Sequence, residues 1–288
     1  MIRKQENLKS FNLFHYLKEQ EQHNMAVPYF LANDTTYKNV GVSFPLRNFA
    51  YGIGITYTGK PGSVKIGSAD YVLQPGSLTT IGPGIVSQWE PYHEAKHETL
   101  YFTENIFTHI IKNSFLHSLP FFQPGGHHVL QTTTAQTQQI KSIFALLGQF
   151  SHQPAIMPGL IYSLLKLAEE YHQSTVTAKP ASSRQELITA DFRRLLSQHA
   201  FEQKDVSFYA GQLNITPKYL SEVLLEQTGK TTKKWIDEHL AMEAKSLLKQ
   251  TAMTVQEISF WLGFEDISYF TKTFKKWEGM TPVAFRKL

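Results

Sequence analysis

The C-terminal third of the chain contains dense helix start and stop signals, and these signals occur twice in the same order. In each copy a short helix, a turn and a second helix ending in glycine follow one another, over 206–229 and again over 255–279. Asp205 and Thr216 are suitable caps for the two helices of the first copy, and Gly229 provides a left-handed stop. This order of elements predicts a duplicated helix-turn-helix.

A long helix, expected over Thr232–Gln250, joins the two copies. The second copy begins with a capping box between Thr254 and Glu257, and Asp266 caps its second helix. Each second helix buries one apolar face and leaves the opposite face free. The predicted shared core consists of Phe208, Ala210, Leu213, Ile215, Leu220 and Leu224 in the first copy and of Ile258, Trp261, Leu262, Phe264, Phe270 and Phe274 in the second.

The free face of the last long helix combines short hydrogen-bond donors with cations. Five basic residues and one acidic residue, Glu278, lie within 272–287, whereas 184–288 as a whole has 15 basic and 13 acidic residues. Donors and cations on one stripe are what contacts to phosphates and base edges require. The alternative for the two lysines at the helix end is an ordinary solvated surface. The stripe consists of Ser268, Tyr269, Lys272, Lys275 and Lys276.

The segment 258–286, ISFWLGFEDISYFTKTFKKWEGMTPVAFR, resembles the signature of the AraC/XylS family of transcriptional regulators. Thr228-Gly229-Lys230 and Trp235-Ile236 upstream also match that family, and the resemblance extends over the C-terminal region without gaps. It implies two helix-turn-helix units that enter successive major grooves on one side of a DNA duplex, about 34 Å apart.

Carried over position by position, the resemblance also implies the DNA contacts. Glu222 departs from the pattern, because many relatives have a basic residue there; it either accepts from cytosine N4 or is solvated or paired within the protein. His239 stands where many relatives have arginine, so a phosphate or packing role there does not carry over. The implied base contacts are Lys218, Ser221 and Glu222 in the first unit and Ile267, Ser268 and Lys272 in the second, with Tyr269, Lys275 and Lys276 nearer the phosphates.

Residues 28–134 contain short β-type segments separated by Pro and Gly turns. The run 49–58 alternates large apolar residues with small or polar ones and stops at a Gly-Lys-Pro-Gly turn. Such spacing predicts an antiparallel barrel or sandwich. The stretch 71–84 is similar to the cupin-type barrels that precede such DNA-binding domains.

Two amphipathic helices are expected within 134–173, where apolar residues recur at helical spacing. They either pack on the barrel or form a subunit interface in a homodimer. We therefore predict an α+β chain with three parts. Residues 1–173 form a cupin-like β-barrel with two packing helices, 174–183 form a linker, and 184–288 form an all-α domain with two helix-turn-helix units joined by the long helix.

A small barrel has room for one small ligand, so the N-terminal domain is expected to sense a small molecule, to mediate dimerisation, or both. The aromatic residues Trp89, Tyr51 and Tyr57 are the candidate ligand contacts. Tyr51 and Tyr57 share one face of their strand, and Gly52 and Gly54 share the other. That small-residue face leaves room either for a ligand or for close packing of another element.

No metal, cofactor or catalytic site is expected. The chain has no cysteine, which excludes thiolate ligands and cysteine nucleophiles. Metal-binding cupins place His and Glu ligands before their Pro-Gly turn, but 53–70 contains neither residue. His93 and His97 would share a face only on a helix, and we expect a loop there.

The composition excludes a disordered chain, since 42% of the residues are hydrophobic and 18% charged, and the net charge is +4. No apolar run approaches the roughly 20 residues that span a bilayer. We expect a cytoplasmic protein whose partners are double-stranded DNA, a small-molecule effector and a second copy, with RNA polymerase as a further candidate and no membrane. The alternatives are a regulator without a ligand, controlled by abundance or a protein partner, and a cupin enzyme with a helical interaction domain.

Overall fold

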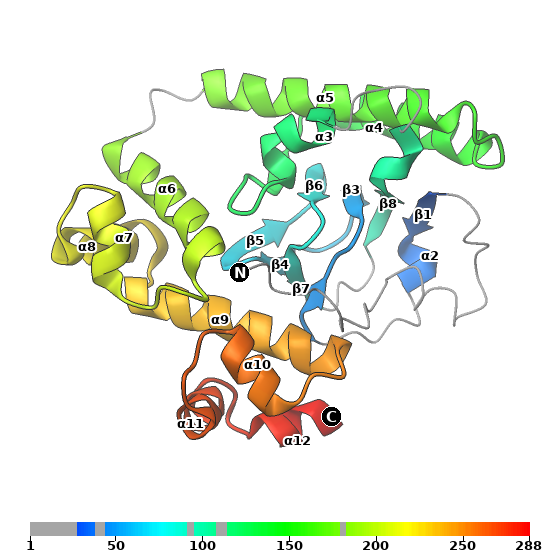
Figure 1. Ribbon diagram of the computed structural model, residues 1–288. Helices are drawn as coiled ribbons and strands as arrows, with labels where there is room; N and C mark the ends of the chain where they lie inside the picture. Colours follow the sequence, from blue (N-terminus) through cyan, green and yellow to red (C-terminus); the bar gives the residue numbers. More distant parts are fainter. Residues whose placement is uncertain (1–27, 38–43, 91–94, 108–113, 179–182) are drawn as a thin grey trace.

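The computed structural model describes residues 28–37, 44–90, 95–107, 114–178 and 183–288. Its N-terminal region contains two antiparallel β-sheets, and its C-terminal region consists of helices (Figure 1). The predicted α+β class is confirmed. Among the described residues, strand pairing does not join the two sheets into one continuous barrel.

The strands are β1 (Tyr29–Asn33), β2 (Leu46–Arg47), β3 (Tyr51–Thr58), β4 (Gly62–Ile66), β5 (Ala69–Leu73), β6 (Ser77–Ile81), β7 (Val86–Trp89), β8 (Lys96–Phe102) and β9 (Val129–Gln131). The first sheet has the strand order β1-β8-β3-β6-β9 and the second the order β2-β7-β4-β5. Successive residues of β3 face opposite sides of the first sheet. Ile53 faces the outer side, where it joins one apolar core. The neighbouring Gly52 pairs with Ile81 of β6, which belongs to a second core between the two sheets.

Part of the region that we predicted to be β is helical. Four short helical elements interrupt the strands, and η2 begins at Pro120, whose fixed φ suits the first position of a helical turn. They are α2 (Asp34–Tyr37), η1 (Glu104–Phe107), α3 (Ser114–Ser118) and η2 (Pro120–Phe122).

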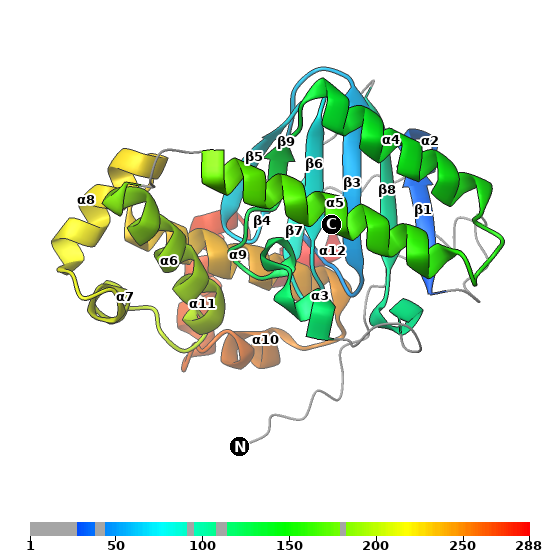
Figure 2. The ribbon, with the colours of Figure 1, turned by 90° about the horizontal axis from the view of Figure 1, so that it is seen from above.

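Two long helices, α4 (Thr134–Gln149) and α5 (Met157–Ala178), lie across the outer face of the first sheet (Figure 2). Their apolar faces form one core with that sheet, in which Phe144 and Leu164 are buried together with Ile53. The predicted packing of two helices on the β structure is confirmed. Because the apolar stripes are used within the chain, they no longer argue for a subunit interface, and the homodimer stays a prediction.

Helix α5 is longer than we predicted. It continues to Ala178, five residues into the segment 174–183 assigned to the linker. Ser, Thr, Val and Ala do not break a helix, whereas Pro180 disfavours helical backbone in the residue before it. Residues 179–182 lie outside the described part of the chain.

The duplicated helix-turn-helix is confirmed. The capping box of Thr254 and Glu257 is present, and Gly229 and Gly279 adopt φ values of 70° and 75° at the ends of their helices. Predicted and observed boundaries agree closely, because these caps act over three or four residues. The helices are α6 (Arg184–His199), α7 (Val206–Gln212), α8 (Pro217–Thr228), α9 (Thr232–Gln250), α10 (Val255–Trp261), α11 (Ile267–Glu278) and α12 (Pro282–Lys287).

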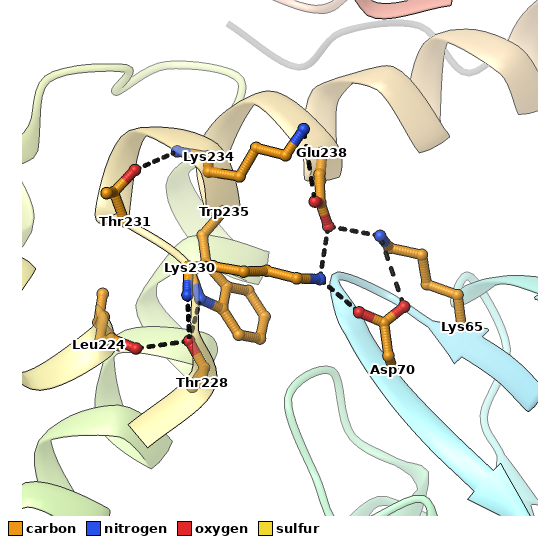
Figure 3. Close-up of polar contacts among 9 residues, drawn as sticks. All are labelled: Lys65, Asp70, Leu224, Thr228, Lys230, Thr231, Lys234, Trp235 and Glu238. Atoms are coloured by element: carbon orange, nitrogen blue, oxygen red, sulfur yellow. Dashed lines mark hydrogen bonds and ion pairs between the residues drawn. The ribbon is translucent and has the colours of Figure 1, made fainter. Parts of the chain in front are cut away.

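Helix α9 packs against the second sheet, so the two regions of the chain meet there (Figure 1). A cluster of four charged side chains joins them near the N-terminal end of α9 (Figure 3). Lys65 Nζ lies 2.5 Å from Glu238 Oε2, which also contacts Lys230 Nζ at 2.8 Å. Lys230 further pairs with Asp70, and Lys65 Nζ lies 3.6 Å from the other oxygen of that carboxylate.

A second set of polar contacts joins the two regions further along α9. The Arg47 guanidinium of β2 pairs with Glu243, and the Arg47 backbone N–H donates to Gln250 Oε1 at 2.9 Å. Ala69 of β5 is buried in the core of the helical domain. The interface is therefore largely polar, with a small apolar contribution.

Candidate nucleic-acid interface

Helix α11 has one buried aromatic face and an exposed face that carries lysines. Asp266 caps it by accepting from the backbone N–H of Tyr269, and Phe270 and Phe274 are fully buried on its inner face. The opposite face is exposed. Five of the six residues that we predicted for the second recognition helix lie away from the buried rings: Ser268, Tyr269, Lys272, Lys275 and Lys276. Ile267 is also exposed, at the N-terminal end of the helix, but it lies on the same side as Phe270 and Phe274.

The charge on this face is positive and is not offset by ion pairs with the described acidic residues. Among the described residues, no carboxylate lies within ion-pair distance of Lys272, Lys275 or Lys276. The nearest acidic residue in sequence, Glu278, is paired with Lys245 of α9 at 3.1 Å. Three ammonium groups are thus available to an anionic partner such as a DNA backbone.

Helix α8, the first recognition helix, has a different character. Its N-cap Thr216 and the following Pro217 start it as predicted. Lys218 and Glu222 are exposed, and their charged atoms lie 3.9 Å apart, one helical turn along the same face. The Ser221 hydroxyl contacts Thr232 Oγ1 at 3.1 Å, so this side chain already has a partner within the protein.

Two side chains near the interface have structural roles. Arg286, part of the basic C-terminal segment, donates to the carbonyls of Leu248 and Met253 at 3.1 and 2.5 Å, so its charge secures the end of α9. His239 is buried, and burial lowers the pKa of its imidazole, which indicates a neutral ring. It packs beside the ring of Phe201.

The two tyrosines predicted for a ligand site lie on the helix-covered face of the first sheet. Tyr51 stacks on Phe102 and donates to Glu104 Oε1 at 3.0 Å. Tyr57 donates to Glu98 Oε2 at 2.5 Å. Burial, followed by these hydrogen bonds, raises the pKa of both phenols well above the ordinary value.

Trp89 lies apart from them, at the end of β7 in the second sheet, where its indole Nε1 donates to Ser87 Oγ. The structure does not gather the three aromatic residues into one site. Sequence alternation defines the two faces of β3, but not which face the helices cover. On the other face, a Cβ at Gly52 would lie 3.1 Å from the Tyr101 ring and one at Gly54 would lie 2.7 Å from Thr99 Oγ1. Close packing from β8 therefore occupies the small-residue face at these two glycines.

The described residues contain no group of three or more His, Cys, Asp or Glu side chains that could hold a metal ion. His97 lies in β8, and His93 lies outside the described residues. Within the described residues, no helix is both long enough and apolar enough to span a bilayer.

Sequence reasoning missed the charged cluster between the regions and the role of Lys204 described below. Lys65 and Glu238 are 173 positions apart, and Lys204 and Gly263 are 59 apart. Neither pair belongs to a local motif. The sequence shows that these residues are charged, but it does not indicate which distant residue each of them contacts.

Known proteins resemble this chain over both of its regions. A family model described as a helix-turn-helix domain matches residues 209–288. The arabinose operon regulatory protein of Escherichia coli (strain K12) is 25% identical over 256 residues, which cover 87% of this chain and 85% of that protein. The HTH-type transcriptional activator RhaR of Salmonella dublin is 29% identical over 136 residues, 46% of each chain. Among solved structures, ToxT of Vibrio cholerae with unsaturated fatty acid bound aligns with 92% of this chain and 96% of its own, at 15% identity and a TM-score of 0.37.

The matched residues begin in α7 and include the whole of α8 to α12, hence both recognition helices. The relatives are transcriptional regulators and not enzymes, in agreement with the expectation that the chain has no catalytic site. Residues 209–288 therefore form a helix-turn-helix domain, and its duplicated units, its signature segment and its relatives all make the chain similar to the AraC/XylS family of DNA-binding transcriptional regulators.

Proposed function

We propose that this regulator binds specific DNA sites by inserting α8 and α11 into successive major grooves on one side of the duplex. The observation that carries the proposal is the exposed face of α11, opposite a fully buried aromatic face: its three lysines have no acidic partner in the part of the chain that the structure describes. Ser268, Lys272 and Ile267 are proposed to read bases, and Tyr269, Lys275 and Lys276 to contact phosphates.

We further propose that α8 contributes less to the charge-driven part of binding. Lys218 lies beside Glu222, which offsets its charge, and Ser221 is engaged with Thr232. Base reading by Lys218, Ser221 and Glu222 requires that these contacts open when DNA binds. Affinity then comes mainly from α11 and weakens as salt rises.

The proposed division of the chain assigns the N-terminal region to control and residues 184–288 to DNA. The E. coli relative is a regulatory protein of an arabinose operon, which supports control by a small molecule such as a sugar. A homodimer, contact with RNA polymerase and a cytoplasmic location are part of the same proposal. The second candidate is a regulator without a ligand, favoured by the packing of Tyr101 and Thr99 over Gly52 and Gly54.

The test of DNA binding uses the full chain and sheared genomic DNA from its host at physiological salt. Sequencing the retained fragments should recover a few sites, each with two short blocks about one helical turn apart. Retention of DNA without a shared motif would contradict two-groove reading. A metabolite that gives a saturable thermal shift would favour the liganded regulator over the second candidate.

A further inference from the structure

The loop that leads into the first helix-turn-helix unit touches the second unit directly, in addition to the packing of both units on α9. Lys204 lies in the loop between α6 and α7, and its Nζ donates to the carbonyl oxygen of Gly263 at 2.6 Å. The same ammonium donates to the carbonyl of Phe201 at 3.1 Å and lies 4.8 Å from the ring centroid of Phe264. One cation thus bridges the loop that leads into the first unit and the turn inside the second.

The backbone of this loop is also in close contact with the backbone of the second unit. Gly263 has a φ of +72°, and a Cβ on it would lie 1.7 Å from the carbonyl oxygen of Phe201. No side chain fits there unless the backbone moves. Phe201 belongs to the edge of the helical core, beside the ring of His239. The contact is therefore a fit of one backbone segment against another, closed by the Lys204 side chain.

The surroundings of Lys204 differ from those of the lysines on α11. Its ammonium is committed to two carbonyls and covers an aromatic ring, whereas Lys272, Lys275 and Lys276 are exposed. Burial, and then the charge of Lys233, lower the pKa of Lys204. A lysine held in this way is not presented to a phosphate.

We propose that Lys204 is a positioning residue for DNA binding, which fixes α11 relative to α8 and so limits the protein to one spacing between its two half-site blocks. This assignment rests on the proposed two-groove function. One inserted base pair moves the second block by about 3.4 Å and rotates it by about 34° around the duplex. Rigidly joined units do not follow that displacement, whereas loosely joined units do.

The experiment compares the full chain with Lys204→Met and Lys204→Arg. Methionine keeps the unbranched stem over the Phe264 ring but cannot donate to the carbonyls; arginine keeps the charge and the donors. Each protein selects binding sites from a pool of random double-stranded DNA. Its affinity is then measured on a recovered site and on the same site with one base pair inserted or removed between the blocks.

We expect one preferred spacing for the wild type and for Lys204→Arg, with an affinity loss of about tenfold or more on the altered sites. Lys204→Met should select sites with several spacings, and its affinity should fall about threefold or less on the altered sites. If Lys204→Met does not fold, Lys204→Gln, which retains one donor group, replaces it. Its affinity loss on the altered sites should lie between those expected for the wild type and for Lys204→Met.

Three results would overturn the assignment. The first is a Lys204→Met variant with the spacing preference of the wild type. The second is a Lys204→Met variant whose affinity falls by the same factor on every spacing and whose slope of log affinity against log salt concentration is lower by about 0.9. That combination would indicate a lost phosphate contact. The third is a wild type that recovers no paired blocks, which overturns the proposed two-groove function as well.

Discussion

At the scale of single residues, Lys272 lies in the middle of α11 and is exposed, at the position where we propose that it reads a base. We predict that Lys272→Ala costs about 1–3 kcal/mol of binding free energy on a specific site and relaxes specificity at one base pair. Anisotropy titrations against a recovered site and its single-base variants measure both effects.

Two control variants, Lys276→Ala and Lys96→Ala, are compared with Lys272→Ala. Lys276→Ala removes a proposed phosphate contact, so it should weaken binding to all sequences alike and lower the salt slope by about 0.9. Lys96 is exposed on β8, far from α11 in the fold, and Lys96→Ala tests the effect of net charge alone. Unchanged affinity and selectivity of Lys272→Ala would contradict its assignment as a base contact.

A second prediction at this scale concerns pH. Burial lowers the pKa of His128 and of His172 to about 4, and His172 stacks on the ring of Phe121. An unfolded histidine has a pKa of about 6.5. Between these two values the unfolded chain binds protons that the folded protein excludes, so the free energy of unfolding falls as pH falls from 6.5 to 4.

His172→Phe keeps a ring against Phe121 and removes the titrating nitrogens. Its loss of stability between pH 7 and pH 4 should be smaller than that of the wild type by roughly 1–3 kcal/mol. Urea unfolding at several pH values measures this difference. His152 is exposed and provides the control, His152→Phe; an equal acid response in both variants would sink the prediction.

At the scale of elements, Gly263 and Gly279 follow the two helices of the second unit with φ values of 72° and 75°. A Cβ at Gly279 meets nothing within 4 Å, whereas one at Gly263 meets the Phe201 carbonyl. We predict that Gly279→Ala costs about 1 kcal/mol of stability, the conformational cost alone. Gly263→Ala should cost about 3 kcal/mol or more, because a backbone must also move.

Thermal unfolding followed by helical circular dichroism compares these two variants directly. Equal losses of stability would show that the contact between the units does not constrain them.

Prediction from sequence was most successful for the helices of the C-terminal domain, since caps and apolar spacing act within one helical turn. It was less successful for η1, α3 and η2, because such short elements carry too few residues for a periodic signal. The three candidate ligand residues are not brought together for another reason. Tyr51, Tyr57 and Trp89 were chosen by residue type, while the sheet and the side that each occupies depend on long-range pairing.

At the scale of the whole molecule, the pair Lys65–Glu238 connects the second sheet with α9. Both side chains are about four-fifths buried, so their attraction is less screened than that of a surface pair. We predict a coupling energy of about 1 kcal/mol from a double-mutant cycle with Lys65→Met and Glu238→Gln. The coupling should decrease as salt is added.

The pair Lys233–Asp237, one turn apart within α9 and 3.1 Å in separation, is the matched control. Its Lys233 side chain is exposed, and the expected coupling is about 0.3–0.5 kcal/mol, as for other pairs one turn apart on one helix. Denaturant unfolding of the single and double variants gives both values. Equal coupling in the two pairs would mean that the cluster adds nothing to the contact between the regions.

The amino-acid sequence was enough to predict the duplicated helix-turn-helix, the ends of most of its helices and the exposed cationic face of α11. These features follow from capping, left-handed stops and apolar spacing, which need only residues three or four positions apart. Which charged side chains have partners within the protein depends instead on the packing of distant segments. Arg286 donates to the carbonyl of Met253, 33 positions away, and Lys204 donates to that of Gly263, 59 positions away. Lys230 pairs with Asp70, 160 positions away. No local rule predicts such pairs, because they depend on how helices pack within the C-terminal region and, for Lys230 and Asp70, on how the two regions pack together.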